Sequence, residues 1–299
     1  MSMTTLKAPF PWFGAKSKAA VHVWERFGQV HSYIEPFCGS CAVLLSNPAP
    51  PDIETVNDAD IWISNFWRSV KTKREEVVEA ADFPVSEIDL VARHKFLAKE
   101  HGNLVEKMLN DHEWCDPTLA GIWVWGLCAW IGDSWTRKPE HKQLPSLGNA
   151  GKGINRTTKL PRREYIETQL SALQARLRNV RIANGQWNRV LGPAVIQGCT
   201  AVFLDPPYKS TDHGVNYAGD STACVWSDVC EWCEQNGGNA QLRIALCGYR
   251  GTWEAPEGWE ELHWKGKQGM GRGGNRSEKN RRRETIWFSP GCLDADMLF

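Results

Sequence analysis

The sequence lacks the features of membrane and secreted proteins. No apolar run approaches the roughly 20 residues that span a bilayer. The start of the chain, Met-Ser-Met-Thr-Thr-Leu-Lys, has no apolar segment like that of a signal peptide. Its 299 residues, 42% of them hydrophobic, allow one large α/β domain, with or without an insertion. We therefore expect a soluble, cytoplasmic protein.

The cysteines do not indicate a disulfide scaffold. Ten cysteines in a chain of this length are more typical of reduced thiols than of a small secreted domain. Cys38 and Cys41 form one Cys-x-x-Cys pair, Cys230 and Cys233 another, and four such thiolates could bind zinc. The pairs lie far apart, however, and the first falls in a glycine-containing turn. We expect buried small side chains and no metal.

An overall excess of charge is also absent, since 35 basic residues balance 35 acidic ones. The balance hides two local excesses: residues 137–189 hold 12 Lys/Arg against three acids, and residues 265–283 hold eight against one. Two basic blocks predict one face that contacts nucleic-acid phosphates, and solvated surface charge is the alternative. The side chains that we expect to make these contacts are Arg137, Lys138, Lys152, Arg156, Arg272, Arg276 and Arg282.

Strands and helices alternate along most of the chain. The pattern predicts strands at 32–34, 53–56, 180–183, 201–204, 243–247 and 285–288, and helices at 163–179 and 228–235. This order is typical of an α/β sheet. The Gly/Arg segment 266–283 is either a hairpin that reaches into a groove or a disordered loop.

Residues 71–164 interrupt this alternation. They contain an acidic helical stretch, a Trp-rich segment and a polar stretch with several turn-forming glycines. Gly121–Trp130 is apolar on all sides of a helix, which predicts a buried helix, and most of the sixteen tryptophans are expected to pack in the core rather than stack on bases. We interpret residues 71–164 as an insertion with a basic loop.

The most informative stretch is Asp205-Pro206-Pro207-Tyr208, which follows an apolar strand. The two prolines stiffen the turn, so the Asp205 carboxylate and the Pro206 carbonyl become fixed hydrogen-bond acceptors beside the ring of Tyr208. Such a socket suits a planar amine, and similar loops occur in enzymes that methylate the exocyclic amine of a flipped nucleobase. A strand end with a proline-rich turn is the alternative.

Two other segments have the character of a nucleotide-binding site. A strand, a turn with Gly39 and a helix start expose backbone N–H groups to a ligand, and the acid Asp58 after the next strand is suited to ribose hydroxyls. The alternative role for Asp58 is a helix N-cap. Near the N-terminus, Trp12 and Lys16 offer a stacking face and a cation, unless they belong to a plain loop.

Taken in order, these segments resemble the Dam-type DNA N6-adenine methyltransferases, including their phage and prophage relatives. The resemblance rests on Trp12–Lys16, Tyr33–Cys41, Asn57–Asp58 and Asp205–Tyr208. It covers the first 60 residues and much of 163–288, whereas the insertion matches in placement and character only.

The resemblance implies an α/β fold, with a Rossmann-like sheet that binds S-adenosylmethionine (SAM) and an inserted, mainly helical target-recognition region. The catalytic domain would then comprise 1–70 and 165–299, and the target-recognition region 71–164. Asp205, Pro206, Pro207 and Tyr208 would be catalytic. The implied cofactor-binding residues are Trp12, Lys16, Glu35, Pro36, Phe37, Gly39, Asp58 and Asp205.

The implied activity is methyl transfer from SAM to the N6 amine of a flipped adenine in double-stranded DNA. Two positions depart from the family pattern: Ala15 and Cys41 each replace a glycine, and Cys41 is expected to crowd the cofactor. The alternatives are methylation of cytosine N4, RNA or a protein amide, and a DNA-binding homologue that has lost catalysis.

Overall fold

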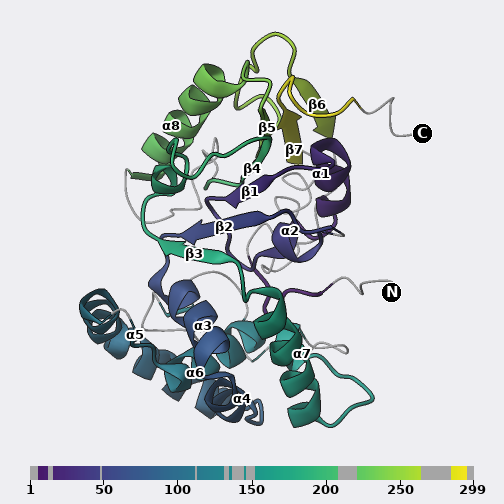
Figure 1. The fold of residues 1–299 in the computed structure, drawn as a ribbon. Helices are drawn as coiled ribbons and strands as arrows, with labels where there is room; N and C mark the ends of the chain where they lie inside the picture. Colours follow the sequence, from purple (N-terminus) through teal and green to yellow (C-terminus); the bar gives the residue numbers. More distant parts are fainter. Residues whose placement is uncertain are drawn as a thin grey trace.

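The structure is a computed structural model. It describes residues 6–12, 16–47, 49–111, 113–130, 135–136, 145, 152–207, 221–263 and 284–294. A sheet with helices on both faces forms one half of the molecule, and a group of helices lies beyond the edge strand β3 (Figure 1).

The sheet has seven strands in the order β3-β2-β1-β4-β5-β7-β6. The strands are β1 (Ser32–Glu35), β2 (Ile53–Asp58), β3 (Arg181–Asn184), β4 (Thr200–Leu204), β5 (Leu242–Tyr249), β6 (Glu260–His263) and β7 (Glu284–Phe288). β1 to β5 are parallel, while β7 runs antiparallel to both β5 and β6. The chain builds outward from β1 to β3 and then returns to add β4 on the other side of β1. Ligands of open α/β sheets bind at such a switch point, outside the carboxyl ends of the strands.

Both faces of the sheet are buried, which explains the nearly continuous apolar run of β4. Ala201 and Phe203 face a core shared with the helices that precede β4 in the chain, whereas Val202 and Leu204 face a second core shared with α8 (Ser221–Asn236). A strand buried on both sides has no polar face, so its sequence does not alternate. The expected Rossmann-like sheet is confirmed.

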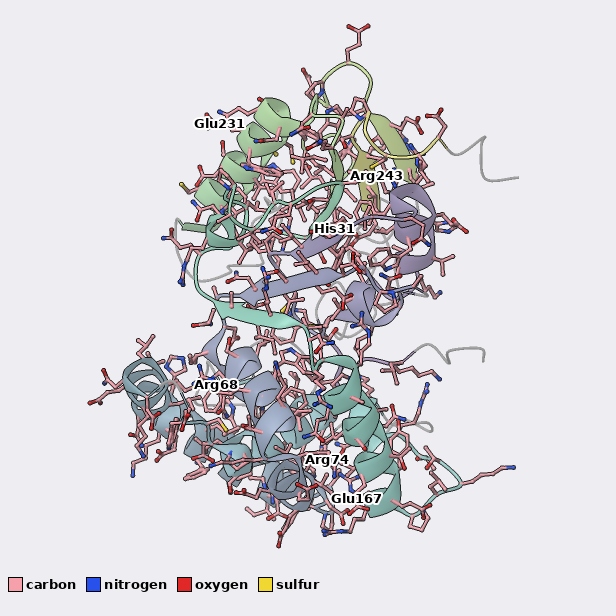
Figure 2. The ribbon with its side chains drawn as sticks, in the orientation of Figure 1. His31, Arg68, Arg74, Glu167, Glu231 and Arg243 are labelled. Carbon is pink, nitrogen blue, oxygen red and sulfur yellow. The ribbon has the colours of Figure 1, made fainter. Side chains whose placement is uncertain are left out.

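The helices α1 (Ala20–Phe27), α2 (Ala42–Leu45) and α8 belong to the sheet half, and a further group of helices lies between β2 and β3 in the sequence. These are α3 (Ile61–Thr72), α4 (Arg74–Ala81), α5 (Glu87–Asn110), α6 (Pro117–Ala129), the short 3₁₀ helix η1 (Gly153–Asn155) and α7 (Arg162–Arg176); the 3₁₀ helix η2 (Trp187–Val190) follows β3. Figure 2 labels Arg74, whose guanidinium donates from α4 to Ser171 and Gln174 of α7 at 3.1 and 2.9 Å.

The Trp-rich segment forms the buried helix that its sequence predicts. Trp123 and Trp125 of α6 are buried, and Gly121 lets the backbone of α4 approach, since a Cβ there would lie 2.7 Å from the carbonyl oxygen of Val77. Phe10 joins this core from the N-terminal segment, with its ring centroid 5.0 Å from that of Trp123. Most tryptophans that the structure describes are buried, as expected.

Three details differ from the sequence-based expectations. β6 is an additional strand at the sheet edge with only Leu262 partly covered, so it has no hydrophobic pattern. α8 begins at Ser221, earlier than the apolar spacing indicated. Asp60, not Asp58, caps α3 by accepting a hydrogen bond from Trp62 N. In the part of the chain that the structure describes, no helix is long and apolar enough to span a bilayer.

Candidate active site

The end of β1 is held from beneath by Glu35. This carboxyl is 2% exposed and accepts hydrogen bonds from Tyr33 Oη at 2.9 Å and from the Leu44 backbone N–H at 3.3 Å, so it ties β1 to α2. Burial raises the pKa of Glu35 to about 8, although the two hydrogen bonds oppose the increase. Glu35 therefore lies under the turn after β1, where it fixes the position of that turn.

Gly39 forms the surface of this turn. Its φ is +45°, and a Cβ there would lie 2.3 Å from Cδ1 of the Trp12 indole, so both the backbone conformation and the contact require glycine. Its N–H donates to Asp58 Oδ2 at 2.9 Å. Trp12, Gly39 and Asp58, three predicted cofactor residues from separate segments, thus lie together.

Cys41 occupies a position that favours glycine for a different reason. Its φ of +54° is in the left-handed region, where a side chain costs about 1–2 kcal/mol. The side chain is fully buried in the core, and the Cys41 backbone N–H donates to the Cys38 carbonyl at 2.6 Å. The Cys41 side chain therefore packs beneath the turn, and the departure from glycine strains the backbone. Cys230 and Cys233 lie in the second core, and no cluster of three metal-binding side chains occurs among the described residues.

Asn57 joins three strand ends. It is 1% exposed, and its Nδ2 donates to the carbonyl oxygens of Pro36 and Gly185, both at 3.0 Å. The Asp58 carbonyl accepts from Asn184 Nδ2 at 2.8 Å and from Gly185 N at 3.1 Å. These bonds hold the loop after β3 against the turns after β1 and β2.

An aromatic pair lies on this part of the site. The rings of Phe37 and Trp187 stack with centroids 6.0 Å apart and an interplanar angle of 23°. Phe37 follows β1 directly and Trp187 follows β3, so the pair bridges the same loops as Asn57. Trp187 is buried in the second core, and Phe37 is partly buried against that core.

Asp205 follows β4 and is paired with Lys16, 189 positions earlier in the chain. The Lys16 Nζ lies 2.9 Å from Oδ1 and 3.0 Å from Oδ2 of Asp205. Although burial lowers the pKa of Lys16, the negative charges of Asp205 and Glu284 outweigh it, and the net pKa is raised above its ordinary value. Pro206 is buried, and Tyr208 lies outside the described residues.

The position of this pair at the carboxyl edge, beside the Gly39 turn, agrees with a comparison of the sequence with protein families. Residues 12–112 match the model of the D12 class N6 adenine-specific DNA methyltransferases. The matched segment is similar to DNA adenine methyltransferases of the Dam type, which supports this class of enzyme for the chain. The matched segment includes Trp12, Lys16, Gly39 and Asp58 and ends before Asp205. A search of the curated proteins found no match.

The structure describes only some of the predicted DNA-contacting residues. Arg137, Lys138, Arg272, Arg276 and Arg282 lie outside the described residues. Lys152 is half-buried and Arg156 is exposed, on either side of η1. η1 is fixed to the N-terminal segment, because Ile154 N donates to the Pro9 carbonyl at 2.8 Å.

The sequence did not predict two parts of the candidate site. The first is the Asn184–Trp187 loop, for which the signal was an Asn-Gly pair after a strand, followed by a tryptophan. The second is Glu284 at the start of β7, whose Oε2 lies 3.8 Å from Lys16 Nζ. A single glutamate after a basic segment gives no signal in the sequence.

Proposed function

We propose that the methyltransferase transfers a methyl group from SAM to the N6 amine of an adenine flipped out of double-stranded DNA. The main support is the Lys16–Asp205 pair, which lies at the switch-point edge of the sheet with Gly39 and Asp58. The Asp205 acceptor and the Gly39 turn lie at the same edge, so an amine and a methyl donor bound there would lie close together.

The residues present suit SAM. The Gly39 turn would admit the cofactor where a Cβ cannot be accommodated, Asp58 would accept from the ribose hydroxyls, and Phe37 and Trp187 would contact the adenine ring. When bound, SAM supplies an electrophilic methyl on a sulfonium. Asp58 Oδ2 would exchange its bond with Gly39 N for a hydroxyl donor, or share it.

The chain contributes orientation and electrostatics. The exocyclic amine of adenine is a weak nucleophile because its lone pair is delocalised into the ring. If the Asp205 carboxylate and the Pro206 carbonyl accept the two N–H groups, they favour a pyramidal nitrogen and stabilise its developing positive charge. Holding that nitrogen in line with the methyl group lowers the barrier further. Lys16 orients the Asp205 carboxylate through both of its oxygens.

We assign target recognition to residues 71–164, with the basic side chains on either side of η1 directed to phosphates. Support comes from the position of the helices beyond β3 and from the exposure of Arg156 (Figure 1). Phosphate contacts of this kind position the protein without selecting sequence.

The proposal is tested by incubating the protein with mixed-sequence duplex DNA and SAM, digesting the DNA, and identifying the methylated nucleoside. We expect N6-methyladenine, and none with Asp205→Ala, which should still bind labelled SAM. N4-methylcytosine, or methylation of RNA only, would overturn the assignment to adenine in DNA. An inactive wild-type protein that binds no SAM would instead support the alternative of a catalytically lost homologue.

A further inference from the structure

A second carboxylate lies beside the Lys16–Asp205 pair. Glu284 is the first residue of β7 and faces Tyr249 of β5 in the antiparallel register. Because β7 runs opposite to its neighbour, its first residue lies at the edge where the parallel strands end. Its side chain is 13% exposed, comparable to that of Asp205 at 18%.

The ammonium of Lys16 lies between these carboxylates, but not midway. It is within hydrogen-bonding distance of both Asp205 oxygens and 3.8 Å from Glu284 Oε2, which is close for an ion pair but too long for a hydrogen bond. A movement of Nζ by about 1 Å would form a bond with Glu284 and lengthen one bond with Asp205.

We propose that Glu284 is a positioning residue. It accepts a hydrogen bond from the Lys16 ammonium when the Asp205 carboxylate turns to the target amine. This inference rests on the proposed function. An ammonium that is 2% exposed requires another acceptor as soon as one of its bonds is released. Glu284 supplies that acceptor, so Asp205 can bind the amine without leaving Lys16 unpaired.

The charges support the same role. Among the residues that the structure describes, the cluster holds two carboxylates and one ammonium, and Glu35 nearby is largely protonated at pH 7 because burial raises its pKa to about 8. The excess negative charge lies where the amine becomes positive during transfer. Neutralising Glu284 removes that excess and directs the ammonium entirely to Asp205, which weakens Asp205 as an acceptor for the amine.

Glu284→Gln keeps the size of the side chain and removes its charge, and Glu261→Gln on the neighbouring edge strand β6 is the matched control. We expect Glu284→Gln to lower kcat by about 10- to 100-fold, while the KM for SAM, the binding of labelled SAM and the Tm remain close to wild type. Glu284→Asp should recover part of kcat, and the control should leave it unchanged.

A second measurement separates a role through Lys16 from a direct or merely structural one. Lys16→Met and Glu284→Gln should be strongly non-additive, so that the double variant has about the kcat of Lys16→Met alone. Additive losses, an unchanged kcat, or a loss of Tm and SAM binding that matches the loss of kcat would each overturn the inference. If wild type forms no N6-methyladenine, the proposed function fails first and the inference with it. An active wild type with an equally active Glu284→Gln refutes only the inference.

Discussion

Replacing Gly39 by alanine tests the cofactor turn most directly. A Cβ at this position would lie 2.3 Å from Cδ1 and 2.5 Å from Nε1 of the Trp12 indole, distances at which one of the groups must move. The residue also has φ +45°, which costs a non-glycine residue about 1–2 kcal/mol. We expect Gly39→Ala to lower the free energy of unfolding by about that amount, plus the cost of displacing the indole.

The same substitution should also weaken SAM binding. Trp12 and the Gly39 N–H, which donates to Asp58, both change position when the turn opens, so the contacts on either side of the cofactor change together. We expect at least a tenfold increase in the Kd for SAM, about 1.4 kcal/mol. Titration with labelled SAM and chemical denaturation measure the two quantities separately.

Two variants are controls for the predicted effects of Gly39→Ala. A Cβ at Gly102, in α5, meets no atom within 4 Å, so Gly102→Ala should raise stability by up to about 1 kcal/mol and leave SAM binding unchanged. Trp12→Ala makes room for the new Cβ, so Gly39→Ala should cost less stability in that background. If Gly39→Ala bound SAM as tightly as wild type, the assignment of this turn to the cofactor would be refuted.

Two further variants test the groups that support the site. Burial raises the pKa of Glu35 in the folded protein to about 8, so its stabilising contribution is present below the unfolded pKa of about 4.3 and is lost as the pH rises through 8. The Tm of wild type should therefore fall between pH 6 and 9 more steeply than the Tm of Glu35→Gln. Parallel curves of Tm against pH would contradict this. Arg176 pairs with the buried Glu54 at 2.5 and 2.6 Å, so Arg176→Met should lower the free energy of unfolding by about 3–5 kcal/mol, because an unpaired carboxylate remains buried. A loss below about 1 kcal/mol in chemical denaturation would contradict this.

The positions of the parallel strands in the sequence could be predicted because each strand carries a local signal. β4 is a short apolar run that ends in Asp205 and two prolines, and β1 and β2 end at Glu35 and Asp58 near turn residues. The carboxyl ends of parallel strands meet at one edge, so these side chains were expected to lie close together. The structure brings them to that edge, with the boundaries shifted by one or two residues.

The edge strand β6 and the role of Glu284 could not be predicted in this way. Three of the four residues of β6 are exposed polar groups, so its strand conformation depends on pairing with β7 and not on a pattern of its own. Glu284 reaches the site because β7 is antiparallel, and the direction of a strand is set by the topology of the whole sheet. A carboxylate that acts through such a long-range arrangement has no neighbouring motif.

At Cys41, the sequence and the structure lead to different interpretations of the departure from the family pattern. From the sequence, a cysteine in place of glycine suggested a side chain that obstructs the cofactor. The structure places that side chain in the core, while the backbone retains the left-handed conformation that glycine would adopt without strain. Cys38 N is fixed by the Asn57 carbonyl at 2.9 Å, and Gly39 N by Asp58, so the neighbouring residues hold the turn in place despite the strain. The turn keeps its shape because β2 specifies it, and residue 41 needs only to be small and buried.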